Sequence, residues 1–97
     1  MSDKKDKIFE KMKEVVDPEF GFPIVDRGLL DEIKVEGKKA IIKYHLTVPF
    51  CPPVFAIFIG KQIRQKAMEI EGIEEVEVIC QHHVQAEKIN KALRDES

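Results

Sequence analysis

The sequence predicts an α+β fold in which helices pack on one small three-stranded sheet, in the order α-β-β-α-β-α. Apolar residues recur at helical spacing in some segments and alternate with polar residues in the segments between them. A chain of 97 residues is long enough for one small core. We therefore expect a single domain over residues 1–97.

The first helix is expected to begin after a cap at Ser2 or Asp3 and to end before Pro18. Its apolar residues fall at i, i+1, i+4, i+7 and i+8, which places them on one face of a helix. They are Ile8, Phe9, Met12, Val15 and Val16.

Two β-rich runs follow, residues 29–35 and 39–47, with Gly37 in the short segment between them. This pattern predicts a β-hairpin. One face of the second strand carries apolar side chains, and Ile41 on the other face suggests that this side is also partly covered. The apolar face consists of Ala40, Ile42, Tyr44 and Leu46.

The remaining chain predicts a helix over residues 53–70, a strand over 73–80 and a last helix within 83–95. Gly72 is a plausible residue to follow the first of these helices. Its apolar positions, including the phenylalanines, are expected to face the core: Phe55, Phe58, Ile59, Ile63, Ala67 and Ile70. The strand would bury Val76, Val78 and Cys80. The last helix would use either Val84 or Ala86 together with Ile89 and Leu93.

Charge and composition exclude several classes of function. The net charge is −2 with both signs interspersed, so there is no clustered basic face for a nucleic acid. No segment approaches the roughly 20 apolar residues that span a membrane. The first twelve residues lack the apolar core of a secretory signal. We expect a soluble, cytoplasmic protein with no membrane or nucleic-acid partner.

Two loops contain residues that helix and strand formation do not explain. The first, DPEFGFPIVDRGLL, holds Asp17, Glu19 and Asp26 within ten positions. The second, TVPFCPP, holds Cys51 just before the expected start of a helix at Pro52 or Pro53. The carboxylates have an ordinary alternative reading as turn and cap residues.

Cys51 is the strongest candidate for chemistry. The unpaired N–H groups and positive dipole end of a helix lower the pKa of a nearby thiol, and the thiolate is the form that binds metal or attacks an electrophile. The alternative is that Cys51 fills a small apolar gap. Two cysteines do not make a disulfide scaffold, and Cys80 is expected to pack in the core. His82 and His83 suggest a weak metal motif with Cys80, but a solvated turn is favoured, and His45 receives no role.

The sequences of the two loops together resemble the motifs of a known family. VVDPEFGFPIVDRGLL is similar to the signature D-P-E-x-x-x-x-I-V-D-x-G-L, and TVPFCPP to T-x-x-x-C-P, of small iron–sulfur cluster assembly factors of the SufT and PaaD types. The resemblance covers roughly residues 8–93. The matching positions are Asp17, Pro18, Glu19, Asp26, Gly28, Thr47, Cys51 and Pro52. Arg27 departs from the family pattern, where a leucine is expected.

The resemblance implies a fold like that of the C-terminal domain of NifU-type scaffolds, with Cys51 as the functional thiol. The C-x-x-C motif of those scaffolds is absent. Because clusters are most often held by four thiolates, Cys51 cannot hold one alone. The other ligands would come from a second subunit in a homodimer, from Cys80 or a nearby histidine, from a partner, or from a small thiol.

The function implied is therefore a carrier and not an enzyme: a factor that binds a transient iron–sulfur cluster through Cys51 and delivers it to apo-protein clients, together with other assembly proteins. Two alternatives stay open. One is a non-catalytic accessory subunit of a PaaD-like oxygenase system. The other is a small enzyme with Cys51 as nucleophile and His82 or His45 as its base.

Overall fold

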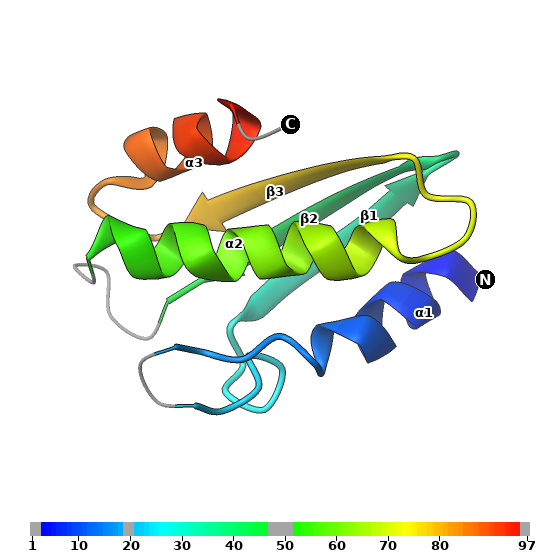
Figure 1. Ribbon diagram of the computed structural model, residues 1–97, viewed down its shortest axis with the longest axis horizontal. Coiled ribbons are helices and arrows are strands. Elements are labelled where there is room, and N and C mark those ends of the chain that lie inside the picture. The colour runs from blue at the N-terminus through cyan, green and yellow to red at the C-terminus, as the bar shows by residue number, and fades with distance from the viewer. Residues whose placement is uncertain (1–2, 19–20, 47–51, 96–97) are drawn as a thin grey trace.

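The computed structural model describes residues 3–18, 21–46 and 52–95, and its elements follow the expected order (Figure 1). They are α1 (Asp3–Met12), β1 (Leu30–Glu36), β2 (Lys39–His45), α2 (Pro53–Met68), β3 (Glu75–Gln81) and α3 (Ala86–Asp95). The strands form one three-stranded sheet in the order β1-β2-β3. The predicted α+β fold is confirmed.

The sheet is mixed because its two connections differ. β1 and β2 form the predicted antiparallel hairpin, whose turn contains Gly37 with a φ of 62°. Glycine suits this left-handed conformation because it has no Cβ. β2 and β3 are parallel, and α2 is the crossover between them. The carboxyl ends of β2 and β3 therefore lie at the same edge of the sheet.

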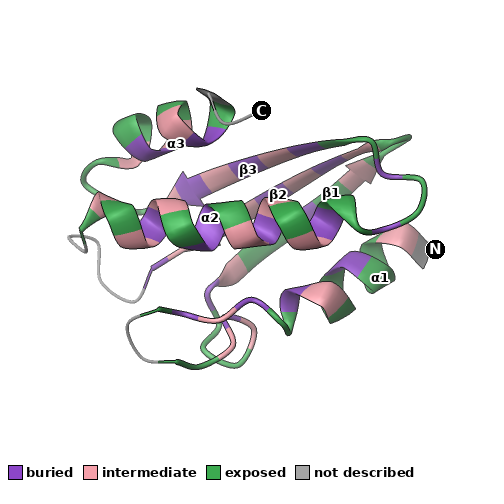
Figure 2. Ribbon diagram, viewed as in Figure 1, coloured by how far each residue is buried: buried purple, intermediate pink, exposed green. Residues whose placement is uncertain are grey.

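The core lies between α2 and one face of the sheet (Figure 2). α2 runs across this face, with α1 and α3 on either side of it (Figure 1). The predicted apolar faces of β2 and β3 are buried, as are Ile59, Ile63 and Ala67 of α2. Gly60 allows α3 to approach closely, since a Cβ at this position would lie 2.7 Å from a methyl group of Leu93.

The opposite face of the sheet is half-buried and carries ion pairs. Lys39 lies 3.4 Å from Glu77, and Lys43 lies 3.5 Å from Glu32. Ile41 and Ile79 lie on this face and are partly exposed. The expectation that Ile41 is partly covered is confirmed.

The first helix is shorter than predicted. Helix α1 ends at Met12, and the chain then turns through 3₁₀-type hydrogen bonds, such as the one from Val15 N–H to the Met12 carbonyl (3.0 Å). Val15 is buried as expected, but it reaches the core from outside the helix, and Val16 forms a β-bridge with Pro23. Phe9 is 41% exposed and does not belong to the core.

Three other expected core positions are not fully buried. Phe58 is 50% exposed on the outer side of α2, and Phe55 is only partly buried. The buried stripe of the helix is centred instead on Ala56, Gly60 and Ile63. Val84 is 72% exposed because it precedes α3, so Ile89 and Leu93 form the apolar face of that helix.

None of the helices in the described ranges is long and apolar enough to cross a membrane.

Candidate functional site

The amino end of α2 forms one side of the candidate site. Pro53 occupies the first helical position, as predicted, and Pro52 is the N-cap with φ −55° and ψ 135°. The N-cap Pro52 makes no side-chain hydrogen bond, and the first turn contains no acidic residue. The first turn of the helix itself therefore does not neutralise the positive end of the dipole.

In the sequence, Cys51 directly precedes this N-cap. Cys51 and Thr47 lie outside the described residues, so the expected activation of the thiol stays a prediction. Glu19 of the first motif lies outside them as well.

Backbone hydrogen bonds close the first part of the motif loop, between residues 17 and 22. The Asp17 N–H donates to the Phe22 carbonyl (2.9 Å), and the Gly21 N–H donates to the Asp17 carbonyl (2.7 Å). The Asp17 side chain is 5% exposed. Pro18 and Asp26 are exposed. The loop therefore turns Asp17 inward and Asp26 outward.

Gly28 has a structural reason to be glycine. The Leu29 N–H donates to the Ile24 carbonyl (3.0 Å), and the Gly28 N–H donates to the Val25 carbonyl (3.2 Å). This is the hydrogen-bond pattern of a Schellman motif, whose C′ residue is left-handed. Gly28 has a φ of 69°, and the flanking Ile24 and Leu29 are both buried. The I-V-D-x-G-L part of the signature is thus explained by a single turn that anchors two apolar side chains.

The ends of this loop are attached to the elements that flank Cys51 in the sequence. The His45 N–H donates to the Leu29 carbonyl (2.9 Å), which joins the end of the loop to the end of β2. The Gln62 side chain of α2 donates to the Val16 carbonyl (3.0 Å). These contacts support the expectation that the loop lies near Cys51, which itself stays a prediction. Arg27, the departure from the signature, lies over the Phe22 ring at 5.6 Å.

Cys80 is a core residue, as predicted. It is 2% exposed on the face of β3 that packs against the helices. Burial raises the pKa of the Cys80 thiol to about 11, although a contact with Tyr44 opposes the increase. A thiol in this environment stays protonated at neutral pH and is a poor metal ligand.

Replacing Cys80 with serine is expected to lower the free energy of unfolding by about 1–3 kcal/mol, because it buries a hydroxyl in an apolar environment. Function should be retained as long as the protein is folded. Denaturant unfolding and client activation would be measured on the same preparation. Loss of client activation in a fully folded Cys80→Ser protein would show that Cys80 has a chemical role.

The raised pKa of Cys80 also predicts that the free energy of unfolding depends on pH differently in the wild-type protein and in Cys80→Ser. In the unfolded chain the thiol loses its proton near pH 9.0, whereas in the folded protein it keeps it until about pH 11. Its contribution to stability is therefore complete below pH 9 and is lost as the pH rises towards 11. Between these values, the unfolding free energy should fall more steeply in the wild-type protein than in Cys80→Ser. Parallel slopes in urea titrations would contradict this.

The histidines differ from expectation. His83 is 8% exposed, not solvated, and its Nδ1 accepts a hydrogen bond from the Gln85 N–H (2.9 Å). His45 was given no role, yet its Nδ1 lies 2.8 Å from Oδ1 of Asp31. The ring of His82 lies edge-on to that of His45, with 6.0 Å between the centroids. Sequence reasoning missed this cluster because it depends on strand register.

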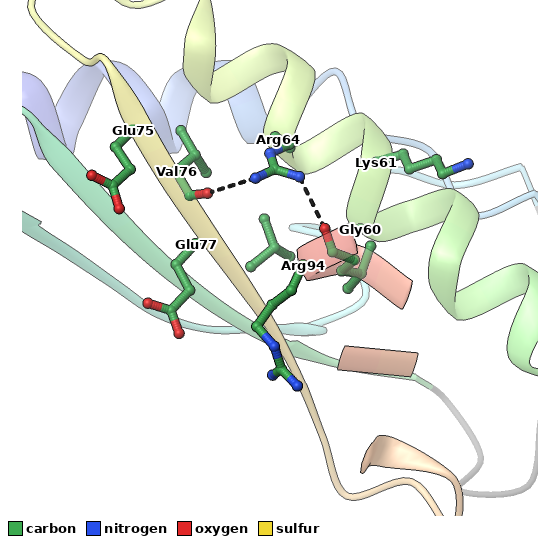
Figure 3. A pocket seen from close by; sticks show the side chains of 9 residues that line it. Gly60, Lys61, Arg64, Glu75, Val76, Glu77 and Arg94 are labelled. Atoms are coloured by element: carbon green, nitrogen blue, oxygen red, sulfur yellow. Dashed lines mark hydrogen bonds between the residues drawn. The ribbon is translucent and has the colours of Figure 1, made fainter. Parts of the chain in front are cut away.

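A hollow of about 530 Å³ lies between α2, β3 and α3, away from the motif loops (Figure 3). Arg64 spans it, donating to the carbonyls of Leu93 (2.9 Å) and Val76 (3.4 Å). Glu75 and Glu77 point away from Arg64 (Figure 3). Arg64 thus joins three elements, and the lining of this hollow includes none of the motif residues that the structure describes.

The fold and the two loops together define the class of this protein: a small α+β domain with a proline-initiated crossover helix next to a cysteine. The model of the iron–sulfur cluster assembly protein family matches residues 5–78, and the chain belongs to this family.

Individual relatives agree with this assignment. An uncharacterised protein of Methanocaldococcus jannaschii is 32% identical over 93 residues, covering 94% of this chain and 95% of the relative. A domain of unknown function from Bacillus anthracis has the same fold, with a TM-score of 0.64 and 21% identity over 96% of this chain and 90% of the other. A Mycobacterium tuberculosis protein associated with iron–sulfur complex assembly and repair has a TM-score of 0.53 and 29% identity, covering 77% of this chain and 65% of its own.

Proposed function

We propose that this protein is a non-enzymatic iron–sulfur cluster assembly factor that delivers clusters to apo-protein clients through the thiol of Cys51. The observation that carries the proposal is the match of the assembly-family model to residues 5–78. The similarity to the M. tuberculosis protein associated with cluster assembly and repair supports the same role.

The amino end of α2 supports Cys51 as the functional thiol. Its first turn has no acidic residue and its N-cap has no side-chain hydrogen bond, so the positive end of the helix is available to a neighbouring thiolate. Pro52 and Pro53 limit the backbone freedom of the chain next to that thiol. A thiolate held in this way is a suitable ligand for iron.

The burial of Cys80 limits how a cluster is held. Its thiol is inside the core with a raised pKa, so it does not provide a second ligand. Clusters generally need several thiolates. We infer that the cluster is transient cargo, held between Cys51 and thiols from a second copy, from an assembly partner or client, or from a small thiol.

Anaerobic reconstitution tests this function. The protein would be incubated with ferrous iron, sulfide and glutathione, and the visible spectrum recorded before and after addition of an apo-dehydratase that needs a [4Fe–4S] cluster. We expect a cluster spectrum and faster activation of the dehydratase than iron, sulfide and glutathione give alone. If neither a cluster spectrum nor faster activation is seen, the carrier function is wrong.

The same reconstitution can be compared with thiol labelling to separate a carrier from a cysteine-dependent enzyme. A carrier should have its Cys51 protected from alkylation by the bound cluster. An enzyme would instead have its Cys51 protected by a small metabolite in the absence of iron. Protection of the second kind alone would favour the enzyme.

A further inference from the structure

Three polar side chains meet near the carboxyl ends of β2 and β3. They are Asp31 of β1, His45 at the end of β2 and His82 just after β3. Asp31 Oδ1 lies 2.8 Å from His45 Nδ1, and the two imidazole rings have centroids 6.0 Å apart at an interplanar angle of 76°. The side chains of Asp31 and His45 are 26% and 30% exposed, so they are accessible to small ligands.

A β-bulge places the carboxylate. Leu30 pairs with Tyr44 and Glu32 pairs with Lys43, so Asp31 is an extra residue without an opposite partner in the hairpin. Bulges redirect side chains and are common next to functional sites. Here the bulge directs Asp31 to His45.

His82 is held in an unusual backbone conformation. Its φ is 55°, the only positive value among the non-glycine residues that the structure describes. Left-handed residues other than glycine are strained and cluster at ligand sites. His82 is the residue immediately after the last residue of β3. Its ring lies next to that of His45.

The hydrogen bond to Asp31 defines what His45 offers to a ligand. A carboxylate accepts a hydrogen bond, so Nδ1 of His45 carries the proton and Nε2 keeps its lone pair. The same carboxylate–histidine arrangement orients metal-bound imidazoles and increases their basicity. Two imidazoles on one tetrahedral zinc ion have centroids roughly 5–5.5 Å apart, given Zn–N bonds of about 2.0–2.1 Å. The observed 6.0 Å is therefore within a small side-chain adjustment of that geometry.

We propose that His45 and His82 bind a divalent transition-metal ion of the Zn²⁺ or Fe²⁺ class through their ring nitrogens, with Asp31 as a positioning residue. Imidazole suits these ions, whereas Mg²⁺ and Ca²⁺ require oxygen ligands. No group of three metal-binding side chains is present among the described residues, so water completes the coordination and the ion exchanges readily. The site consists of described residues alone and does not rest on the function proposed for Cys51.

Calorimetric titration with Zn²⁺ and absorption titration with Co²⁺ test the site, with Mg²⁺ as the ion that should not bind. The variants His45→Gln and His82→Asn each remove one ligand, and asparagine also accepts the left-handed conformation of residue 82. Each should weaken metal binding at least tenfold. All titrations use the Cys51→Ser background, which removes a thiolate that itself binds these ions, and His83→Asn in that background is the matched control that should bind with unchanged affinity. Thermal melts establish that every variant is folded.

Metal affinity and the protonation site of the His45 ring test whether Asp31 positions His45. Asp31→Asn is expected to weaken binding roughly tenfold. It should also move the His45 proton from Nδ1 to Nε2, because the asparagine amide can donate to Nδ1, and nitrogen-15 NMR of the imidazole detects this change.

The proposal is overturned if His45→Gln and His82→Asn bind Co²⁺ like the wild type, or if Mg²⁺ competes equally with Zn²⁺. Absence of Co²⁺ binding in the Cys51→Ser background would also overturn it, since the ion would then be a ligand of that thiol alone. Client activation in the Cys51 variant is measured separately, so failure of this site and failure of the carrier function are distinguished.

Discussion

Cys51→Ser is expected to abolish the maturation of iron–sulfur clients while leaving the stability of the protein almost unchanged. A serine hydroxyl is not ionised near neutral pH and is a poor ligand for iron, so the lost thiolate has no substitute. In the sequence the residue precedes the Pro52 N-cap of α2, so the substitution leaves the cap and the helical positions unchanged. The free energy of unfolding should therefore change by no more than about 1 kcal/mol.

Thermal melts and client activation would be measured side by side for Cys51→Ser and Cys80→Ser. The two variants make the same chemical change, one next to the amino end of a helix and the other in the core. We expect the first to lose activity but not stability, and the second to lose stability but not activity. Full client activation by Cys51→Ser would show that the thiol is not the functional group.

The largest effect on stability is expected for Ile63→Ala. Ile63 is fully buried in the middle of α2, where the helix crosses the sheet. Truncation of such a side chain removes its transfer free energy and leaves a cavity, which together cost about 2–5 kcal/mol. A domain of this size has a total stability of roughly 5–15 kcal/mol, and each kcal/mol lowers Tm by about 4–8 °C. We expect Tm to fall by roughly 8–40 °C.

Phe58→Ala is the matched control, since it removes a larger apolar side chain from the same helix. Phe58 is 50% exposed on the outer side of α2, so its removal should cost less than about 1 kcal/mol. Calorimetric melts of both variants give the comparison. If Phe58→Ala were the more destabilising change, the assignment of the inner and outer sides of α2 would be wrong.

Much of the fold follows from local patterns in the sequence. The alternation in residues 40–46 identified the buried face of β2, and the glycine between the two β-rich runs identified the hairpin. Pro52 or Pro53 was expected at the first position of α2, and the structure places Pro53 there. These predictions succeed because a strand with one buried face and a proline-initiated helix both have short-range signatures.

The errors arose where tertiary contacts decide the outcome. Helical spacing placed Val15 in the first helix, but its N–H bonds to Met12 in a turn after the helix has ended. Phe58 fits the helical period as well as Ile59 does, and only the position of the sheet separates an exposed residue from a buried one.

The Asp31–His45–His82 cluster is the clearest case of a site that the sequence could not reveal. Asp31 and His45 are 14 positions apart, and a register shift in the hairpin brings them together. The unusual backbone of His82 has no sequence signature either. By contrast, the two motif loops could be identified from the sequence, because they resemble the motifs of the family. The structure adds the reason why position 28 is a glycine.

The bulge at Asp31 has a consequence for solubility as well. β1 is an edge strand of the sheet, and its outer backbone groups have no sheet partner within the described ranges. Such edges can pair with the edge of another molecule, and natural proteins interrupt them with bulges and charged side chains. β1 has both, since the bulge at Asp31 is followed by the charged side chains of Glu32, Lys34 and Glu36. These features disfavour intermolecular β-pairing, so deleting Asp31 is expected to lengthen the regular edge and increase the tendency to aggregate.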